Sequence, residues 1–442
     1  MAAQAREARP SHRRTRGRGG SHRLGTVAVA AVLALTAACS GGAAGTADEG
    51  TVLRFTWWGD TSRAERYEQA VALFEEENPD VDVRTGYASW GDYWTSRSTE
   101  AAAGGLPDVM QMDLAYLTEY ASTGRIAALD EHLGSTVDVD ALPESLLPAA
   151  QVDGETYAVP TSTNTLATQV NTALLGELGV PVPEGDLTWD EYDALLGEIA
   201  AAGASRQPAV HGSVDYTQVF WLFQVWLGQQ GKTLFEDDGL GFTREDLARW
   251  WGRAPALHAS GAFLPPERLA QLEGVDALGT GETASDVSWD NFLVRYSEGS
   301  ASPQLVLLPP PADDPDESGL FLKPSLMLSV GANSRHPEEA AALIDFLTND
   351  PRVGEIFGMS RGVPASSTAL EGFEPTGLDA QILEYERALE PRLTSSPPPP
   401  VAGFGTLEAA FTTIAQELAY GNLSVEDGVE EWFTEAETVL GG

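Results

Sequence analysis

The sequence predicts an α/β protein made of two domains. Between residues 51 and 112 the hydrophobic pattern reads strand, helix, strand, helix, strand, and this alternation indicates a parallel sheet with crossover helices. The chain has 442 residues, which is more than one hydrophobic core usually serves. It contains a single cysteine, so both domains must be stable without internal disulfides.

Residues 1–38 are expected to be a signal peptide that is removed from the folded protein. Seven arginines precede an apolar run from Val27 to Leu35, and small residues then lead to Cys39. A basic region, a short apolar region and small residues before a cleavage point are typical of secretion. The segment that ends at Cys39 resembles a bacterial lipobox, in which the cysteine receives a diacylglycerol. An ordinary secretory signal with an incidental cysteine is the alternative.

Residues 39–50 are rich in glycine and alanine and predict a flexible tether. Because two acyl chains suffice for stable attachment, a lipidated Cys39 would anchor the protein to the outer face of the cell membrane. The expected location is therefore extracytoplasmic, with the lipid anchor as the protein's only contact with the membrane.

The protein is strongly acidic. Its net charge is −40, and without residues 1–38 it becomes −46, with 65 acidic and 19 basic side chains. A nucleic-acid partner is excluded, because binding to phosphates requires a basic surface. The histidines show no metal-ligand spacing, so we expect no metal and no cofactor. The charge itself predicts only a soluble, self-repelling surface, and a monomer is expected.

The opening strand, from Val52 to Thr56, leads into the loop Trp57-Trp58-Gly59-Asp60. Ser62 and Glu65 have the spacing of a capping box and predict the start of a helix that Asn78-Pro79 ends. Next come a strand near 81–84, a helix at 92–103, a strand at 108–112 and a helix at 116–124. In open α/β sheets ligands bind at the carboxyl ends of the strands, so residues 58–60, 87–90 and 111–113 are expected to lie together.

The rest of the chain contains further strands and helices. The pattern predicts strands at 154–160, 166–170, 285–287, 305–308 and 326–330, helices at 188–201, 244–260, 337–347, 404–421 and 424–440, and a polyproline spacer at 396–400. We interpret the polar run Thr161–Thr165 as the first crossing between the two domains.

Six short segments carry a family resemblance. They are Phe55-Thr56-Trp57-Trp58-Gly59, Ala102-Ala103-Gly104-Gly105-Leu106-Pro107-Asp108-Val109, Gly154-Glu155-Thr156-Tyr157-Ala158-Val159-Pro160, Thr188-Trp189-Asp190-Glu191, Ser288-Trp289 and Arg361-Gly362-Val363-Pro364. In this order and spacing, the chain after position 50 resembles the solute-binding lipoproteins of carbohydrate ABC importers, the group that includes maltose-binding protein.

The resemblance implies a two-lobed periplasmic-binding-protein type II fold, with a ligand cleft between two α/β domains that a multi-crossing hinge joins. Lobe one would comprise residues 51–163 and 325–364, and lobe two residues 164–324 and 365–442. It implies binding without a catalysed reaction. The protein would hold an extracellular sugar or oligosaccharide, and the membrane subunits of an ABC permease would recognise the closed, loaded form.

A sugar offers flat C–H faces, which aromatic rings cover, and hydroxyls, which carboxylates and amides bind. The candidates for stacking are Trp58, Trp221 and Trp289, and the candidates for binding hydroxyls are Asp60, Asp113 and Arg361, with Trp90, Asn164 and Phe404 in a second rank. We interpret Trp57, Trp189, Trp250 and Trp251 as packing residues. Asp113 has helix capping as its alternative role, and Arg361 has ion pairing.

Two other functions stay open at this point. The same fold could bind a non-sugar solute such as a peptide, a polyamine or a metal chelate. An extracellular glycoside hydrolase is the second alternative, because the many acids leave room for a catalytic carboxylate pair. Gly358-Met359-Ser360-Arg361-Gly362 matches the nucleophile-elbow pattern, but no histidine follows His336, so a serine hydrolase is not expected.

Overall fold

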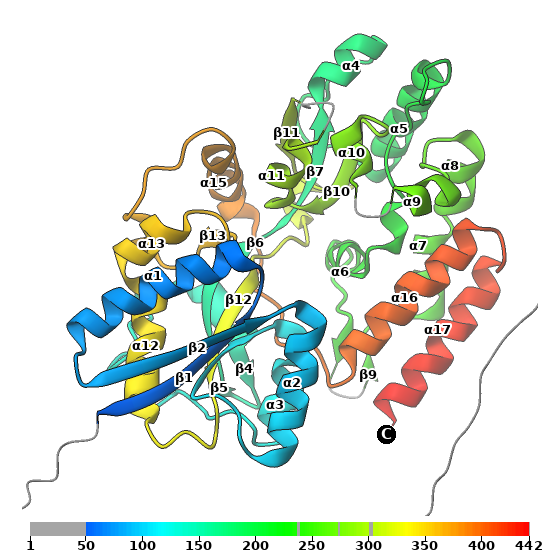
Figure 1. The fold of residues 1–442 in the computed structure, drawn as a ribbon. Coiled ribbons are helices and arrows are strands. Elements are labelled where there is room, and N and C mark those ends of the chain that lie inside the picture. Colours follow the sequence, from blue (N-terminus) through cyan, green and yellow to red (C-terminus); the bar gives the residue numbers. More distant parts are fainter. Residues whose placement is uncertain (1–49, 237–238, 273–274, 300–303, 442) are drawn as a thin grey trace, which may run out of the picture. The chain divides into compact units, whose positions relative to one another are not determined.

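The computed structural model of the protein describes residues 50–236, 239–272, 275–299 and 304–441. The predicted signal peptide, almost all of the tether and Cys39 lie outside these ranges. Two larger sheets, with helices packed against them, organise the described chain (Figure 1). This arrangement confirms the predicted α/β class.

The first sheet has six strands in the order β13-β6-β12-β3-β1-β2. Its parallel half contains β1 (Thr51–Trp58), β2 (Val81–Ala88) and β3 (Val109–Met112). Its antiparallel half contains β6 (Val159–Asn164), β12 (Lys323–Val330) and β13 (Val363–Pro364). Segments that are about 160 and 200 residues apart in the chain therefore share one sheet.

Helices cover this sheet, and the direction of each strand side chain decides which core it enters. The surrounding elements are α1 (Thr61–Glu77), α2 (Trp90–Ala103), α3 (Leu114–Ser122), η1 (Glu144–Ala150), β4 (Gln151–Val152), β5 (Glu155–Thr156), α12 (Pro337–Asn349), α13 (Pro351–Phe357) and α14 (Ser367–Leu370). Trp57 is fully buried with Phe55 and Tyr67, whereas Trp58 packs against Tyr93 and Trp94. Successive strand residues face opposite sides, so the two tryptophans separate, and the predicted packing role of Trp57 is confirmed.

The predicted capping box at Ser62 and Glu65 is wrong. Helix α1 begins at Thr61, and Asp60 caps it by accepting a hydrogen bond from the backbone N–H of Arg63 at 2.9 Å. Aspartate and serine are comparable N-caps, so their preference alone does not fix the start of the helix. Asp60 directly follows the loop after β1 and takes the capping position.

The second sheet is antiparallel, in the order β10 (Ser285–Trp289), β7 (Leu166–Asn171), β11 (Leu305–Leu308). Its neighbours are α4 (Thr172–Leu178), α5 (Trp189–Gly203), η2 (Tyr216–Gln218), α6 (Phe220–Gly228), β8 (Phe235–Glu236), β9 (Gly239–Leu240), α7 (Arg244–Trp251), α8 (Ala254–Ser260), α9 (Pro266–Gln271), α10 (Ala277–Thr280), α11 (Phe292–Ser297), η3 (Pro315–Glu317), α15 (Leu378–Leu389), η4 (Glu390–Arg392), α16 (Phe404–Ala419) and α17 (Val425–Leu440).

The helix predicted at 244–260 is in fact two helices, α7 and α8. Pro255 lies in the first turn of α8, where its missing N–H costs no hydrogen bond, but it could not continue α7. Trp250 and Trp251 end α7 and are fully buried, as is Trp189 at the start of α5, so their predicted packing role is confirmed.

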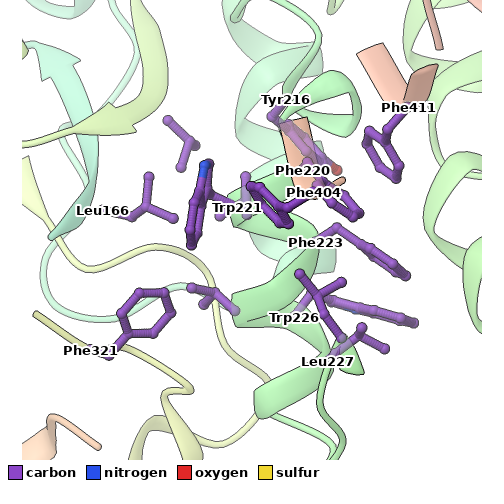
Figure 2. Packing of buried hydrophobic residues seen from close by; sticks show 14 of the residues in the cluster. Leu166, Tyr216, Phe220, Trp221, Phe223, Trp226, Leu227, Phe321, Phe404 and Phe411 are labelled. Atoms are coloured by element: carbon purple, nitrogen blue, oxygen red, sulfur yellow. The ribbon is translucent and has the colours of Figure 1, made fainter. Parts of the chain in front are cut away.

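Helix α6 forms the centre of an aromatic core. Figure 2 shows Phe223 and Phe411 on one side of the helix and Trp221 on the side of Leu166 and Phe321. Helices α16 and α17 pack side by side next to this core (Figure 1). Among the residues described, no helix combines the length and the apolarity that crossing a membrane requires.

Candidate functional site

Trp221 and Trp289 come from separate segments and meet at one surface. Trp221 is the second residue of α6, and Trp289 is the last residue of β10. Their ring centroids are 6.0 Å apart with an interplanar angle of 64°. Trp289 is half-buried, so part of its ring is accessible. The two indoles therefore present aromatic surface at the end of the second sheet.

Lys323 places its ammonium group against both indoles. Its Nζ lies 5.3 Å from the Trp221 ring centroid and 5.4 Å from that of Trp289. Lys323 begins β12, the strand on which the chain returns to the first sheet. Cation–π attraction holds the side chain there, and its one protein acceptor in the described chain is the carbonyl oxygen of Pro324 at 3.4 Å.

Helix α16 closes this surface from the side. Phe404 is fully buried, with its ring centroid 5.1 Å from that of Trp221. Glu408 follows one turn later, and its carboxyl lies near the Trp221 side chain. Burial raises the pKa of Glu408 and nearby Lys323 lowers it, with a net upward shift. Because Asp113 also raises this pKa, the carboxylate at the start of α3 must lie near α16.

A second aromatic group lies at the carboxyl ends of β1 and β2. Trp58 packs edge-on against Trp90 at 4.9 Å, and Trp94 stacks on Tyr116 at 3.7 Å. Trp58 is only 8 % exposed, whereas Trp90 is 46 % exposed. Most of the accessible indole surface of this group therefore belongs to Trp90.

The two acids predicted to bind hydroxyls both act as helix caps. Asp60 caps α1, and Asp113 Oδ1 accepts a hydrogen bond from the backbone N–H of Ala115 at 2.9 Å in α3. A capping carboxylate retains further lone pairs, so capping does not exclude a ligand contact. Their binding roles stay predictions.

Asn164 lies where the chain leaves the first sheet. It is the last residue of β6, pairs in register with Lys323, and is 7 % exposed. Its side-chain Oδ1 is buried and has no hydrogen-bond partner among the described residues. An orphaned buried oxygen next to the Lys323 strand is a potential acceptor for a ligand hydroxyl.

A pair of buried carboxyl groups flanks the same crossing. Thr163 Oγ1 donates to Glu386 Oε2 at 3.0 Å, and the Thr165 N–H donates to Asp290 Oδ2 at 3.2 Å. Burial raises the pKa of both acids, and the charge of Asp290 raises that of Glu386 further. Burial and the proximity of the two carboxyls both favour the protonated form of Glu386.

Arg361 is placed apart from the tryptophan pair. It is 5 % exposed, and its guanidinium carbon lies 3.8 Å from the centroid of the Phe357 ring. Burial lowers its pKa. In the described part of the chain it lines neither of the two hollows described next, and its ligand role stays a prediction.

Two hollows open beside Trp221. The first, of about 440 Å³, is lined by Trp221, Trp289 and Glu408 together with Asp286 and Tyr296, and we name it the lobe-two hollow. The second, of about 580 Å³, is lined by Trp221 and Phe404 and also by Thr118 of α3 and Asp153 of the β4–β5 turn. The structure thus brings together Trp221, Trp289 and Phe404 of the predicted set, whereas Trp58 and Trp90 form a separate group.

Sequence reasoning missed Lys323 and Glu408. A signal for each was present: the chain has only two lysines, and Glu408 lies four residues after Phe404 on a predicted helix. Residues i and i+4 share one helix face, so Glu408 could have been placed beside Phe404.

Comparisons with known proteins agree with this architecture. The family model described as bacterial extracellular solute-binding protein matches residues 58–351, more than half of the chain. A family 1 extracellular solute-binding protein from Alicyclobacillus acidocaldarius is 24 % identical, with a TM-score of 0.70, over 89 % of this chain and 99 % of that one.

Two saccharide complexes share the fold. The oligogalacturonide-binding protein from Yersinia enterocolitica, in complex with saturated digalacturonic acid, is 23 % identical with a TM-score of 0.75 over 88 % of this chain and 99 % of that one. The GacH receptor of Streptomyces glaucescens, studied with acarbose, is 20 % identical with a TM-score of 0.69 over 88 % and 99 %.

These likenesses confirm the two-lobed α/β solute-binding fold. The family binds solutes for ABC importers and lies outside the cell, as the resemblance in the sequence predicted. The chain therefore belongs to the bacterial extracellular solute-binding protein family.

Proposed function

We propose that the protein binds an extracellular sugar or oligosaccharide at the Trp221–Trp289 surface and delivers it to an ABC permease. The observation that carries this proposal is the pairing of two indoles with Glu408, beside a hollow of about 440 Å³. Binding pockets for small molecules fall in this size range, and they combine apolar walls with a few polar groups. The saccharides bound by the Yersinia and Streptomyces proteins support the same ligand class.

Each proposed contact follows from its position. Trp221 and Trp289 would stack on sugar faces, with Phe404 behind Trp221, while Glu408 and Lys323 would bind hydroxyls. From the other side, Trp90 would add accessible indole, with Trp58 packed beneath it, and Asp113 and Asn164 would offer oxygen acceptors. We propose structural roles for Asp60, an exposed cap, and for the buried Arg361.

Closure of two lobes around the ligand completes the proposal. We assign residues 51–163 and 325–364 to lobe one and residues 164–324 and 365–442 to lobe two. These bounds follow the two sheets except at Asn164, Lys323 and α14 (Ser367–Leu370), which belong with the first sheet. A ligand favours closure only if it binds the closed form better, and a sugar held by both lobes meets this condition. The proposed permease would recognise that form, with a monomeric protein anchored through lipidated Cys39.

A thermal-shift screen tests the ligand class. The mature protein would be screened against oligosaccharides, peptides, polyamines and metal chelates, since a bound ligand raises the melting temperature by mass action. We expect a shift with a saccharide and quenching or a shift of tryptophan fluorescence. A shift with peptides or polyamines alone would contradict the carbohydrate proposal, and release of sugar from a bound glycoside would contradict the binding-only function.

A further inference from the structure

We infer that the lobe-two hollow selects uncharged saccharides and rejects their uronate counterparts; this inference rests on the proposed function. The argument depends on which charges line the hollow, which of them already have cationic partners, and what an added carboxylate would meet there.

The charged lining of the hollow is entirely acidic. Asp215, Asp276, Asp286 and Glu408 contribute to its wall, and within the described chain no lysine, arginine or histidine does. Asp215 and Asp286 are 5 % and 6 % exposed. These carboxylates therefore act through a poorly hydrated medium, where repulsion between like charges is stronger than at a wet surface.

Two of the acids have basic side chains as partners. His258 Nε2 lies 2.9 Å from Asp215 Oδ2, and Arg295 Nε donates to Asp276 Oδ2 at 2.8 Å. These partners do not line the hollow, so they hold the acids in place without offering a cation to a ligand.

The other two acids lie next to neutral donor side chains. Tyr296 donates its hydroxyl to Asp286 Oδ2 at 2.5 Å, and the Trp221 side chain lies near the Glu408 carboxyl. Burial raises the pKa of Asp286 to about 6, which leaves it largely ionised above neutral pH. The four acids outnumber the cations near them, so the wall of the hollow is net negative above neutral pH.

Lys323 does not reverse this balance. Its ammonium lies against both indoles, and it is close enough to Glu408 to lower the pKa of that acid. It is not part of the lining of the hollow. Arg295 is also near enough to Asp286 to lower the pKa of that acid, so the four acids of the lining have two permanently charged cations near them, Lys323 and Arg295.

A neutral sugar and a uronate therefore meet opposite conditions. Sugar hydroxyls can donate to Asp286 and Glu408, and hydrogen bonds to an ionised acceptor are the stronger kind. A uronate carboxylate would lose its hydration and face four acids in the lining, which the two nearby cations, Lys323 and Arg295, offset only in part. This combination weakens binding strongly.

The test compares sugars that differ only in charge. Isothermal titration calorimetry of the mature protein at about pH 7.5, where ordinary carboxyls are ionised, would use maltotetraose, cellotetraose and mannotetraose, each beside its C6-oxidised uronate form. We expect at least one neutral tetrasaccharide to bind and its uronate form to bind roughly 100-fold more weakly or not at all.

High salt distinguishes repulsion by acids inside the hollow from repulsion by the acidic surface of the whole protein. At about 0.5 M NaCl the Debye length is only a few ångströms, so repulsion from distant surface acids is screened whereas repulsion inside the hollow persists. We expect the difference in affinity between the neutral saccharide and its uronate form to persist at this salt concentration. Its disappearance at high salt would overturn the inference.

Matched substitutions identify which carboxylates weaken the binding of uronates. Glu408→Gln and Asp286→Asn should each narrow the ratio between neutral and uronate affinity by about tenfold, while Glu431→Gln, the same charge change on the exposed face of α17, should not. An unchanged ratio in both variants, or a wild-type protein that binds a uronate as tightly as its neutral form, overturns the inference and leaves saccharide binding intact. Binding of no saccharide of either kind would instead contradict the proposed function.

Discussion

The two aromatic groups of this protein differ in what their rings touch. In the Trp58 group the rings pack mainly on one another, and only Trp90 exposes much of its surface. In the Trp221–Trp289 pair the rings face Lys323, Glu408 and a hollow. Trp221 is as buried as Trp58, so exposed ring area does not separate the two groups. The second group differs in having charged side chains and a hollow beside its rings, so we expect it to supply most of the affinity and the first group mainly to complete the closed site.

The largest effect is expected for Trp289→Ala. Losing a central stacking surface should weaken binding of the saccharide found in the screen by roughly 30-fold or more, as for an interface hot spot. The unliganded protein should lose only about 1 kcal/mol of unfolding free energy, since the ring is half-buried. Calorimetry and chemical denaturation measure the two quantities.

A matched control uses a tryptophan that the ligand cannot reach. Trp250 is fully buried, and Trp250→Ala should lower the unfolding free energy by about 3–5 kcal/mol. If Trp289→Ala destabilises the protein as much as Trp250→Ala does, Trp289 is a core residue and the comparison fails.

Trp90→Ala tests the other aromatic group and should have a smaller effect. Because Trp90 offers exposed indole at the rim, its loss should weaken saccharide binding by less than about tenfold, with little change in stability. The same titration measures it. A larger loss than that of Trp289→Ala would mean that lobe one carries most of the affinity.

The buried carboxyl pair Asp290 and Glu386, which lies near the crossing between the two sheets, predicts how the free energy of unfolding depends on pH. Because burial raises the pKa of Asp290 and Glu386, the folded state binds protons more tightly than the unfolded state. The free energy of unfolding should therefore fall as pH rises from the ordinary carboxyl range, near 4, to about 7 and above.

Glu386→Gln provides the check on this pair. The amide cannot ionise and can donate to Asp290, so the variant should lose much of this decline when unfolding is followed with urea at several pH values. Equal slopes in the wild type and the variant would show that other groups cause the pH dependence.

The smallest effects are expected at Asp113, where capping and ligand binding can be separated. Asp113→Ala removes the cap of α3 and should lower the unfolding free energy by about 1 kcal/mol. Asp113→Asn keeps the cap but removes the charge, so it should change stability by less than about 0.5 kcal/mol. Weaker saccharide binding in the Asn variant would assign Asp113 a ligand contact, and unchanged binding would leave it as a cap alone.

Much of the fold was predictable because local rules govern it. The opening strand, the start of the helix at Thr188 and the limits of β11 all follow from residues within a few positions of each other. The start of α1 was missed because Asp60 and Ser62 are both good N-caps. The break between α7 and α8 was missed because the effect of Pro255 was overlooked.

By itself, the sequence determined the α/β class, the family resemblance and the packing role of Trp57. The loop that it predicted at Trp57 and Trp58 is wrong, because both residues end strand β1 and face opposite sides of it. Only the tertiary structure decided that Lys323 lies against Trp221 and Trp289, and that Asp290 meets Glu386. The reason is physical. Strand direction and capping depend on neighbours in the chain, whereas these contacts join residues about 30 to 100 positions apart that come together only when the strands and helices of the whole fold have packed.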